Sequence, residues 1–176
     1  MDHLTNKTTY LIGAIHTTKE NDNGVQWRED ITPILENKYK VVVLNPCKMS
    51  LNGFGEINTD KDVKYFKELI KQRKYAQVKE EFYWIIKKDL RCVDKSDFVI
   101  FNYNPTLPTM GSVHEVVNSI NQKKPVLIKC DEEIMDHFNP WLLTLIKPQW
   151  LFTSWDDMWV YLDKINNGNL DSSWWW

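Results

Sequence analysis

The sequence contains few of the residues that build disulfide frameworks, metal centres or membrane spans. Its 176 residues include three cysteines, Cys47, Cys92 and Cys130, which lie far apart and form no Cys-x-x-Cys pair. We therefore expect reduced, mostly buried thiols. No uncharged apolar run approaches about 18 residues, and the N-terminus lacks a basic segment followed by a long apolar one. We expect a cytoplasmic protein with no membrane partner.

Charge of one sign is also scarce. The formal net charge is -2 and the isoelectric point is near 6.1, so nothing in the overall charge favours nucleic acid as a partner. We expect a small-molecule partner instead. Residues 61–91 are the exception, with ten Lys or Arg against five Asp or Glu. This segment is interpreted as a solvated helix face, and a docking surface for phosphates stays open.

Apolar residues make up 43% of the chain and aromatic residues 13%, which is enough for one substantial core. We expect a single domain over residues 1–166 and a polar, then tryptophan-rich, tail over residues 167–176. The last three tryptophans could dock on this subunit or on a neighbouring one, which leaves a homo-oligomer open, or they could end a poorly ordered terminus.

Short apolar runs alternate with helical patterns along the chain, and the runs are rich in Val, Ile and Phe. Strands are predicted at 8–15, 39–45, 97–103, 125–129 and 149–153. The longest helical region lies between the second and third strands and predicts two helices, or one bent near Lys74. These runs are apolar throughout rather than alternating, which indicates strands buried on both faces. The prediction is a flavodoxin-like, doubly wound α/β fold with five parallel strands in the order 2-1-3-4-5.

Such a sheet binds ligands at the carboxyl ends of its strands, where the winding reverses. In the predicted order this point lies between the first and third strands. The rule selects the loops 13–24 and 102–111. The long connection at 45–60 is a further candidate for a functional loop or lid.

Glu115 lies next to the second of these loops and has two possible roles. Ser112 and Glu115 have the spacing of a capping box, in which each side chain bonds the backbone amide of the other residue. Alternatively, Glu115 lies in the first turn of the helix after the third strand. An ionised carboxylate held in a cleft there could attack an acetal-like carbon.

Three segments resemble a known family: "YLIGAI" near the start, "DLRCVDKSDFVIFNY" in the middle, and "MGSVHEVVNSINQKKPVLI" after it. Over about residues 8–130 they are similar to the nucleoside 2-deoxyribosyltransferases and their nucleotide N-glycosidase relatives. That family carries its catalytic glutamate in a Gly-[Ser/Thr]-x-x-Glu step, which Gly111, Ser112 and Glu115 match. The family's acidic residue near the departing base falls on Asp89, and the glycine of its first loop falls on Gly13.

The sequence departs from the family at two positions. Many transferases have an aspartate six residues before the nucleophile and an aromatic residue two before the glycine, where this chain has Thr109 and Leu11. Nucleotide-hydrolysing relatives can place a hydroxyl residue at the first position, near a 5′-phosphate. They also use an arginine from the first loop or helix. The resemblance therefore suggests Arg28 as a second phosphate contact, and an exposed helix charge is the alternative.

Other residues near the predicted loops could line the same pocket. His16 follows the first strand, and a hydrogen-bonded loop histidine is its alternative. Tyr103 could be core or pocket wall. The predicted substrate-binding residues are Gly13, His16, Arg28, Asn102, Tyr103, Thr109, Gly111 and Ser112.

The resemblance implies cleavage of the N-glycosidic bond of a deoxynucleoside or its monophosphate. Glu115 would attack C1′ while Asp89, or a water it orients, protonates the departing base. The sugar would then pass to another base or to water. No metal or organic cofactor is implied. Two rivals remain: a non-catalytic nucleotide-binding or sensing module, and a TIR-like NAD-cleaving enzyme that rests on fold analogy alone.

Overall fold

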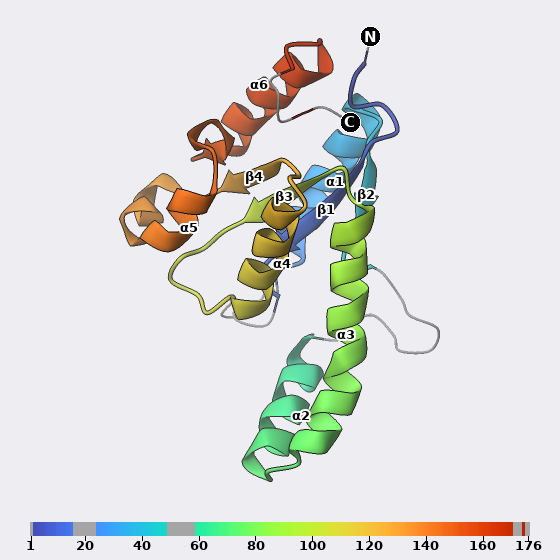
Figure 1. The fold of residues 1–176 in the computed structure, drawn as a ribbon, viewed down its shortest axis with the longest axis vertical. Coiled ribbons are helices and arrows are strands. Elements are labelled where there is room, and N and C mark those ends of the chain that lie inside the picture. Colours follow the sequence, from blue (N-terminus) through green and yellow to red (C-terminus); the bar gives the residue numbers. More distant parts are fainter. Residues whose placement is uncertain (1, 16–23, 49–58, 171–173, 175–176) are drawn as a thin grey trace.

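The computed structural model describes residues 2–15, 24–48, 59–170 and 174. Its centre is a five-stranded parallel sheet in the order β2-β1-β3-β4-β5 (Figure 1), which confirms the predicted flavodoxin-like topology. The strands are β1 (Thr8–Gly13), β2 (Val42–Leu44), β3 (Phe98–Asn102), β4 (Val126–Lys129) and β5 (Leu151–Phe152). All five predicted strands are present, and each is shorter than predicted.

The three inner strands lie at the centre of the core because helices cover the sheet on both faces. Residues 98–101 of β3 and 126–128 of β4 are fully buried. Leu11 pairs with Ile100, and Ile100 pairs with Leu127, so large apolar side chains stand in register across the sheet. This continuous apolar character is what the sequence of a doubly covered parallel sheet requires.

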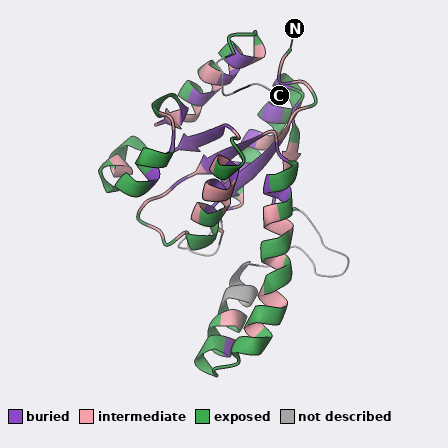
Figure 2. Ribbon diagram, in the orientation of Figure 1, coloured by how far each residue is buried: buried purple, intermediate pink, exposed green. Residues whose placement is uncertain are grey.

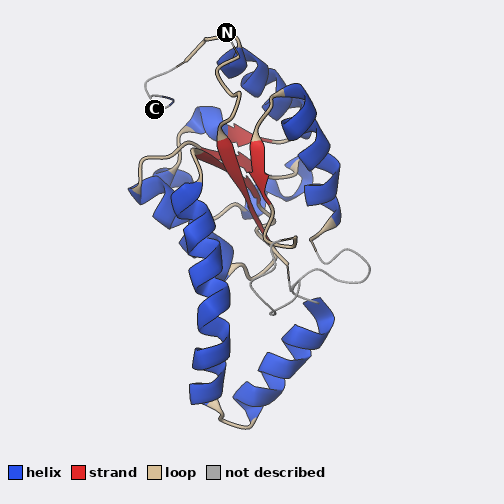
Figure 3. Cartoon of the chain, turned by 90° about the vertical axis from the view of Figure 1, so that its right-hand side faces the viewer, coloured by secondary structure: helices blue, strands red, loops and turns tan. Residues whose placement is uncertain are grey.

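Helices cover both faces of the sheet (Figure 3). On one face, α1 (Gln26–Lys38) packs against α6 (Trp155–Asn166), where the rings of Trp27 and Trp155 stack with centroids 5.7 Å apart. On the other face lie α3 (Tyr75–Lys95) and α4 (Met110–Asn121). The short helices η1 (Glu132–His137), α5 (Pro140–Leu145) and η2 (Pro148–Trp150) join β4 to β5. Because η2 extends to Trp150, β5 begins only at Leu151 and is shorter than the predicted strand.

The α2–α3 hairpin projects from the body of the molecule, and most of its surface is exposed (Figure 2). Helix α2 (Thr59–Lys71) ends just before Arg73, which has a positive φ of 59°. The two-helix alternative is therefore confirmed, with the break at residues 72–74. Phe66 of α2 and Phe82 of α3 hold the hairpin together by an edge-to-face contact at 5.0 Å.

The thiols and the end of the chain follow the expectations in part. None of the three cysteines is in a disulfide, and Cys92 and Cys130 are buried. Trp174 is 1% exposed, packs near Phe98 and donates its indole N–H to the Tyr161 hydroxyl at 2.8 Å. This residue of the tail thus docks on its own subunit. In the described parts of the chain, no helix combines the length and apolar character that crossing a bilayer would require.

Candidate active site

A cavity of about 730 Å³ opens at the carboxyl ends of β1 and β3, where the winding of the sheet reverses. Its walls come from the segments after β1 and β2, from α3, and from the start of α4. The lining residues include 13–15 and 108–112, which belong to the two loops that the switch-point rule selects. The cavity therefore lies where the sequence predicted a ligand site.

Glu115 faces this cavity from the second turn of α4. The helix begins at Met110, so Ser112 lies inside the first turn, and the N-cap residue Thr109 makes no side-chain capping bond. The Glu115 carboxylate instead accepts a hydrogen bond from the Tyr10 hydroxyl at 3.3 Å. The capping-box alternative is wrong, and so is the placement of Glu115 in the first turn, because the helix begins before the position that the box assumes.

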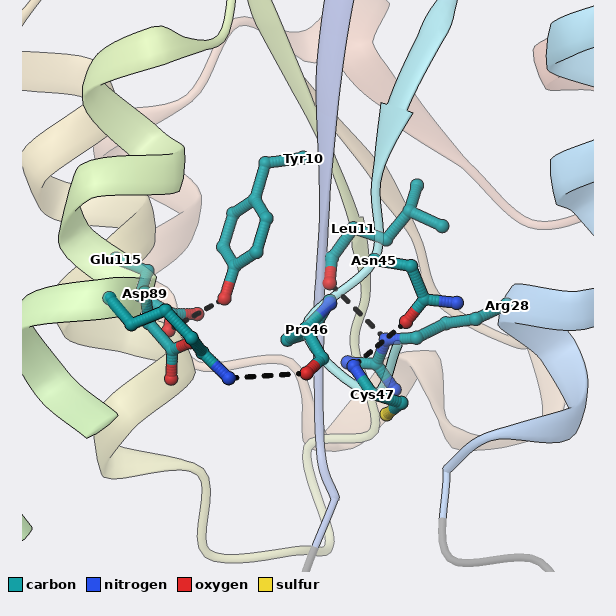
Figure 4. Close-up of polar contacts among 9 residues, drawn as sticks. Tyr10, Leu11, Arg28, Asn45, Pro46, Cys47, Asp89 and Glu115 are labelled. Atoms are coloured by element: carbon teal, nitrogen blue, oxygen red, sulfur yellow. Dashed lines mark hydrogen bonds and ion pairs between the residues drawn. The ribbon is translucent and has the colours of Figure 1, made fainter. Parts of the chain in front are cut away.

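Asp89 reaches the same cavity from α3 and lies beside Glu115 (Figure 4). Its side chain is 15% exposed, and within the described residues the Oδ1 atom has no hydrogen-bond partner. The ammonium of Lys88 lies 3.7 Å from that oxygen and donates to the Pro46 carbonyl at 3.3 Å. The Lys88 side chain is only 8% exposed, so it supplies a largely buried positive charge next to Asp89.

Burial perturbs the pKa of both carboxyl groups. Burial, and then the charge of Asp89, raise the pKa of Glu115 to about 8. Burial also raises the pKa of Asp89, and the Lys88 ammonium opposes this shift. Burial and the Glu115 charge hold the Tyr10 pKa well above its usual value. Two such carboxyl groups share one proton near neutral pH, which leaves one acid and one carboxylate.

Arg28 is fully buried, so the alternative of an exposed helix charge is wrong. Its guanidinium lines the cavity, but it donates to the backbone carbonyls of Leu11 at 3.2 Å, Gly13 at 2.9 Å and Gly24. It also lies 4.4 Å from the centre of the Trp27 ring. These contacts fasten the start of α1 to the end of β1, so the side chain already has a structural task.

Gly13 and Gly111 both line the cavity, for different reasons. A Cβ atom at Gly13 would lie 2.9 Å from the Trp27 ring, so the glycine permits the close packing of β1 on α1. A Cβ atom at Gly111 would meet nothing within 4 Å. The open space at Gly111 lies beside Thr109 and Ser112, which line the cavity as well. The start of α4 is therefore accessible to a ligand.

Two predicted binding residues do not line the cavity. Asn102 ends β3 and pairs with Gly13 and Lys129, and Tyr103 is buried against Phe101 and Phe138. Neither is among the residues that line the cavity. After β3, the chain begins to line the cavity only at Pro108, just before α4. His16 lies outside the described residues.

Sequence reasoning missed Tyr10 and Lys88. A hydroxyl inside an otherwise apolar buried strand needs a hydrogen-bond partner, and this signal could have identified Tyr10. A lysine in the turn of α3 that carries Asp89 was a weaker signal, since most lysines nearby are solvent-exposed. Among the described residues, no group of three or more His, Cys, Asp or Glu side chains is arranged to hold a metal ion.

Comparison with known proteins gives a structural similarity only. No family model and no curated protein sequence matches the chain. Its structure is similar to that of a 2-deoxyribosyltransferase from the psychrotolerant bacterium Bacillus psychrosaccharolyticus, with a TM-score of 0.52 and 17% sequence identity. The match covers 88% of this chain and 95% of that one. The chain therefore has the same fold as a 2-deoxyribosyltransferase, as the sequence motifs suggested.

Proposed function

We propose that this protein cleaves the N-glycosidic bond of a 2′-deoxynucleoside, or of its monophosphate, through a covalent glycosyl-Glu115 intermediate. The observation that carries the proposal is the pair of carboxyl groups, Glu115 and Asp89, which enter one cavity from neighbouring helices. Their raised pKa values support a division into one acid and one carboxylate. The fold shared with a 2-deoxyribosyltransferase supports the choice of substrate.

In the first step, a Glu115 oxygen forms a bond to C1′ of the sugar while the bond between C1′ and the base nitrogen breaks. The electron pair of that bond leaves with the base. Glu115 has the more strongly raised pKa at rest, so in the reacting state the shared proton moves to Asp89, which passes it to the base while Glu115 attacks as the carboxylate. The Tyr10 hydroxyl, 3.3 Å from Glu115, is placed to steady the carboxylate as it attacks. All three groups are then used in the same step.

In the second step, an acceptor attacks C1′ and Glu115 leaves as a carboxylate. The acceptor is a second base in a transferase and water in a hydrolase. Asp89, now ionised, takes the proton from the acceptor in either case. Exclusion of water from the cavity decides between the two outcomes.

The proposal is tested by incubating the protein with a panel of deoxynucleosides and their monophosphates, with and without an added acceptor base. Release of free base without acceptor marks a hydrolase, and exchange of bases marks a transferase. Intact-protein mass spectrometry of the quenched reaction should show a deoxyribosyl adduct, and digestion followed by peptide mass spectrometry should place it on the peptide that contains Glu115. Binding without turnover or adduct would favour a sensing module instead.

A further inference from the structure

One wall of the cavity is apolar and belongs to α3. Phe82, Ile85 and Ile86 line it and lie seven, four and three residues before Asp89, so they share the cavity side of the helix. Phe82 is supported from behind by Phe66 of α2, at 5.0 Å and an interplanar angle of 85°. The wall therefore begins one turn from the proposed acid and continues toward the hairpin tip.

Another part of the cavity lining differs in chemistry. At the start of α4, Thr109 and Ser112 supply hydroxyl groups beside the open space at Gly111. Polar groups of a sugar or a phosphate find partners there. On the α3 wall, the three apolar side chains offer no hydrogen bond to a ligand.

We propose that the wall formed by Phe82, Ile85 and Ile86 is a subsite for an apolar substituent on the base of the substrate. The inference rests on the proposed function, in which Asp89 faces the departing base. A base in contact with Asp89 has its remaining edge beside Ile85 and Ile86. An alkyl or aryl group on that edge then lies along the wall toward Phe82.

Exposure of the wall supports this occupant. Ile86 is 43% exposed although it lines the cavity, and Phe82 and Ile85 are partly buried. Covering this surface with an apolar group removes both surfaces from water, which is favourable. A polar substituent at the same place loses its bound water without gaining a partner. The ligand class is therefore a deoxynucleoside whose base carries an apolar group.

The experiment measures binding, so that it does not depend on turnover. Calorimetry on the Glu115→Gln protein compares deoxyuridine with its 5-methyl, 5-ethyl, 5-propyl and 5-hydroxymethyl derivatives. Each added methylene should tighten binding roughly three- to fourfold, and the hydroxyl of the hydroxymethyl compound should cancel the gain. Ile86→Asn should flatten the alkyl series, and Ile85→Asn provides a second test.

A matched control comes from the same helix. Trp84 is 55% exposed and does not line the cavity, so Trp84→Asn should keep the full alkyl series. Thermal melting of each variant verifies that it is folded. If the parent nucleoside binds but longer alkyl groups bring no gain, the subsite is wrong and the proposed function stands. If no nucleoside binds and none is turned over, both are wrong.

Discussion

The buried charged groups near the end of β1 differ in how many hydrogen-bond partners they have. The Arg28 guanidinium is completely enclosed and donates to three backbone carbonyls. The carboxyl groups of Asp89 and Glu115, on the other face of the sheet, are far less satisfied. Within the described residues, Asp89 Oδ1 has no hydrogen-bond partner, and the bond that the Glu115 carboxylate accepts from the Tyr10 hydroxyl is long, at 3.3 Å.

This difference separates structural from functional burial. A buried polar group without a partner costs about 1–3 kcal/mol, so folds rarely retain one unless it has a use. Arg28 has its partners and holds two elements together. Asp89 and Glu115 face a cavity and have hydrogen-bonding capacity that the protein does not use. An acid and a carboxylate that act on a ligand require this.

The largest expected effect is on turnover by Glu115→Gln. The amide keeps the size of the side chain and can still accept from Tyr10, but it cannot form the glycosyl ester. We expect kcat/KM to fall at least about a thousandfold, while the melting temperature does not fall. Unchanged turnover with a lower melting temperature would make Glu115 a structural residue like Arg28.

The second prediction concerns the other side of the comparison. Arg28→Met should lower the free energy of unfolding by about 3 kcal/mol or more, because three carbonyls lose their donor in a buried place. Lys38→Met is the control, since its ion pair with Asp163 is half exposed and is worth less than about 1 kcal/mol. Denaturant melts measure both. A stable Arg28→Met protein that has lost only phosphate affinity would return Arg28 to the role first predicted.

The sequence predicted the sheet well because apolar runs and strand order depend on local pattern and on simple rules of connection. The five strands and the placement of the cavity beside Gly13 and Gly111 follow from these rules. Glu115 and Asp89 came from a short motif, and the structure places both in the cavity. Their spacing along the chain alone does not bring them together, since α3 and α4 must first pack side by side.

The remaining features depend on tertiary contacts that no pattern encodes. Arg28 had two interpretations, a phosphate contact or an exposed helix charge, yet its side chain is buried and donates to backbone carbonyls at the end of β1. Lys88 looked like one more lysine of a basic segment, yet it is nearly buried beside Asp89. Tyr103 lies just after β3 and was a candidate for the pocket wall, but its ring packs against Phe138 and does not line the cavity.

Asp89→Asn should slow the reaction by about a hundredfold for substrates whose base leaves reluctantly. The same change should matter much less for bases that leave easily, because they need no proton. A series of deoxynucleosides with bases of graded basicity measures this difference. Equal slowing across the series would show that Asp89 is not the acid, and Asp94→Asn serves as an exposed control on the same helix.

The pH dependence should reflect the shared proton. Above about pH 8, the upper pKa of the pair, both carboxyl groups are ionised and the acid is lost. We expect kcat/KM to fall about tenfold per pH unit beyond that value. Below the raised pKa of Asp89 both groups are protonated, the nucleophile is lost, and the rate falls again.

Two further measurements separate this pair from the rest of the protein. Lys88→Met removes the charge beside Asp89, so the acidic limb of the pH–rate profile should move upward by about one pH unit or more, whereas the exposed Lys87→Met should leave it in place.

The pH dependence of stability gives the second measurement. Glu115 binds its proton more tightly in the folded state, so the free energy of unfolding falls as pH rises through the window up to about 8. Glu115→Gln should flatten that fall. A wild-type profile as flat as that of the variant would contradict the buried pair.

The smallest expected effect concerns the phosphate and uses Gly111→Ala. If the start of α4 binds a 5′-phosphate through its backbone amides, as it is placed to do, the monophosphate should be the better substrate. The added methyl meets nothing within 4 Å in the protein and favours the helix, so stability should not fall. It would occupy the space through which a phosphate approaches, and the ratio of kcat/KM for the monophosphate to that for the nucleoside should drop several-fold to about tenfold. Met110→Ala, at a side chain that is 84% exposed, should leave the ratio unchanged. An unaltered ratio in Gly111→Ala would move the phosphate away from α4, and Arg28, despite its three carbonyl partners, would again be the candidate contact.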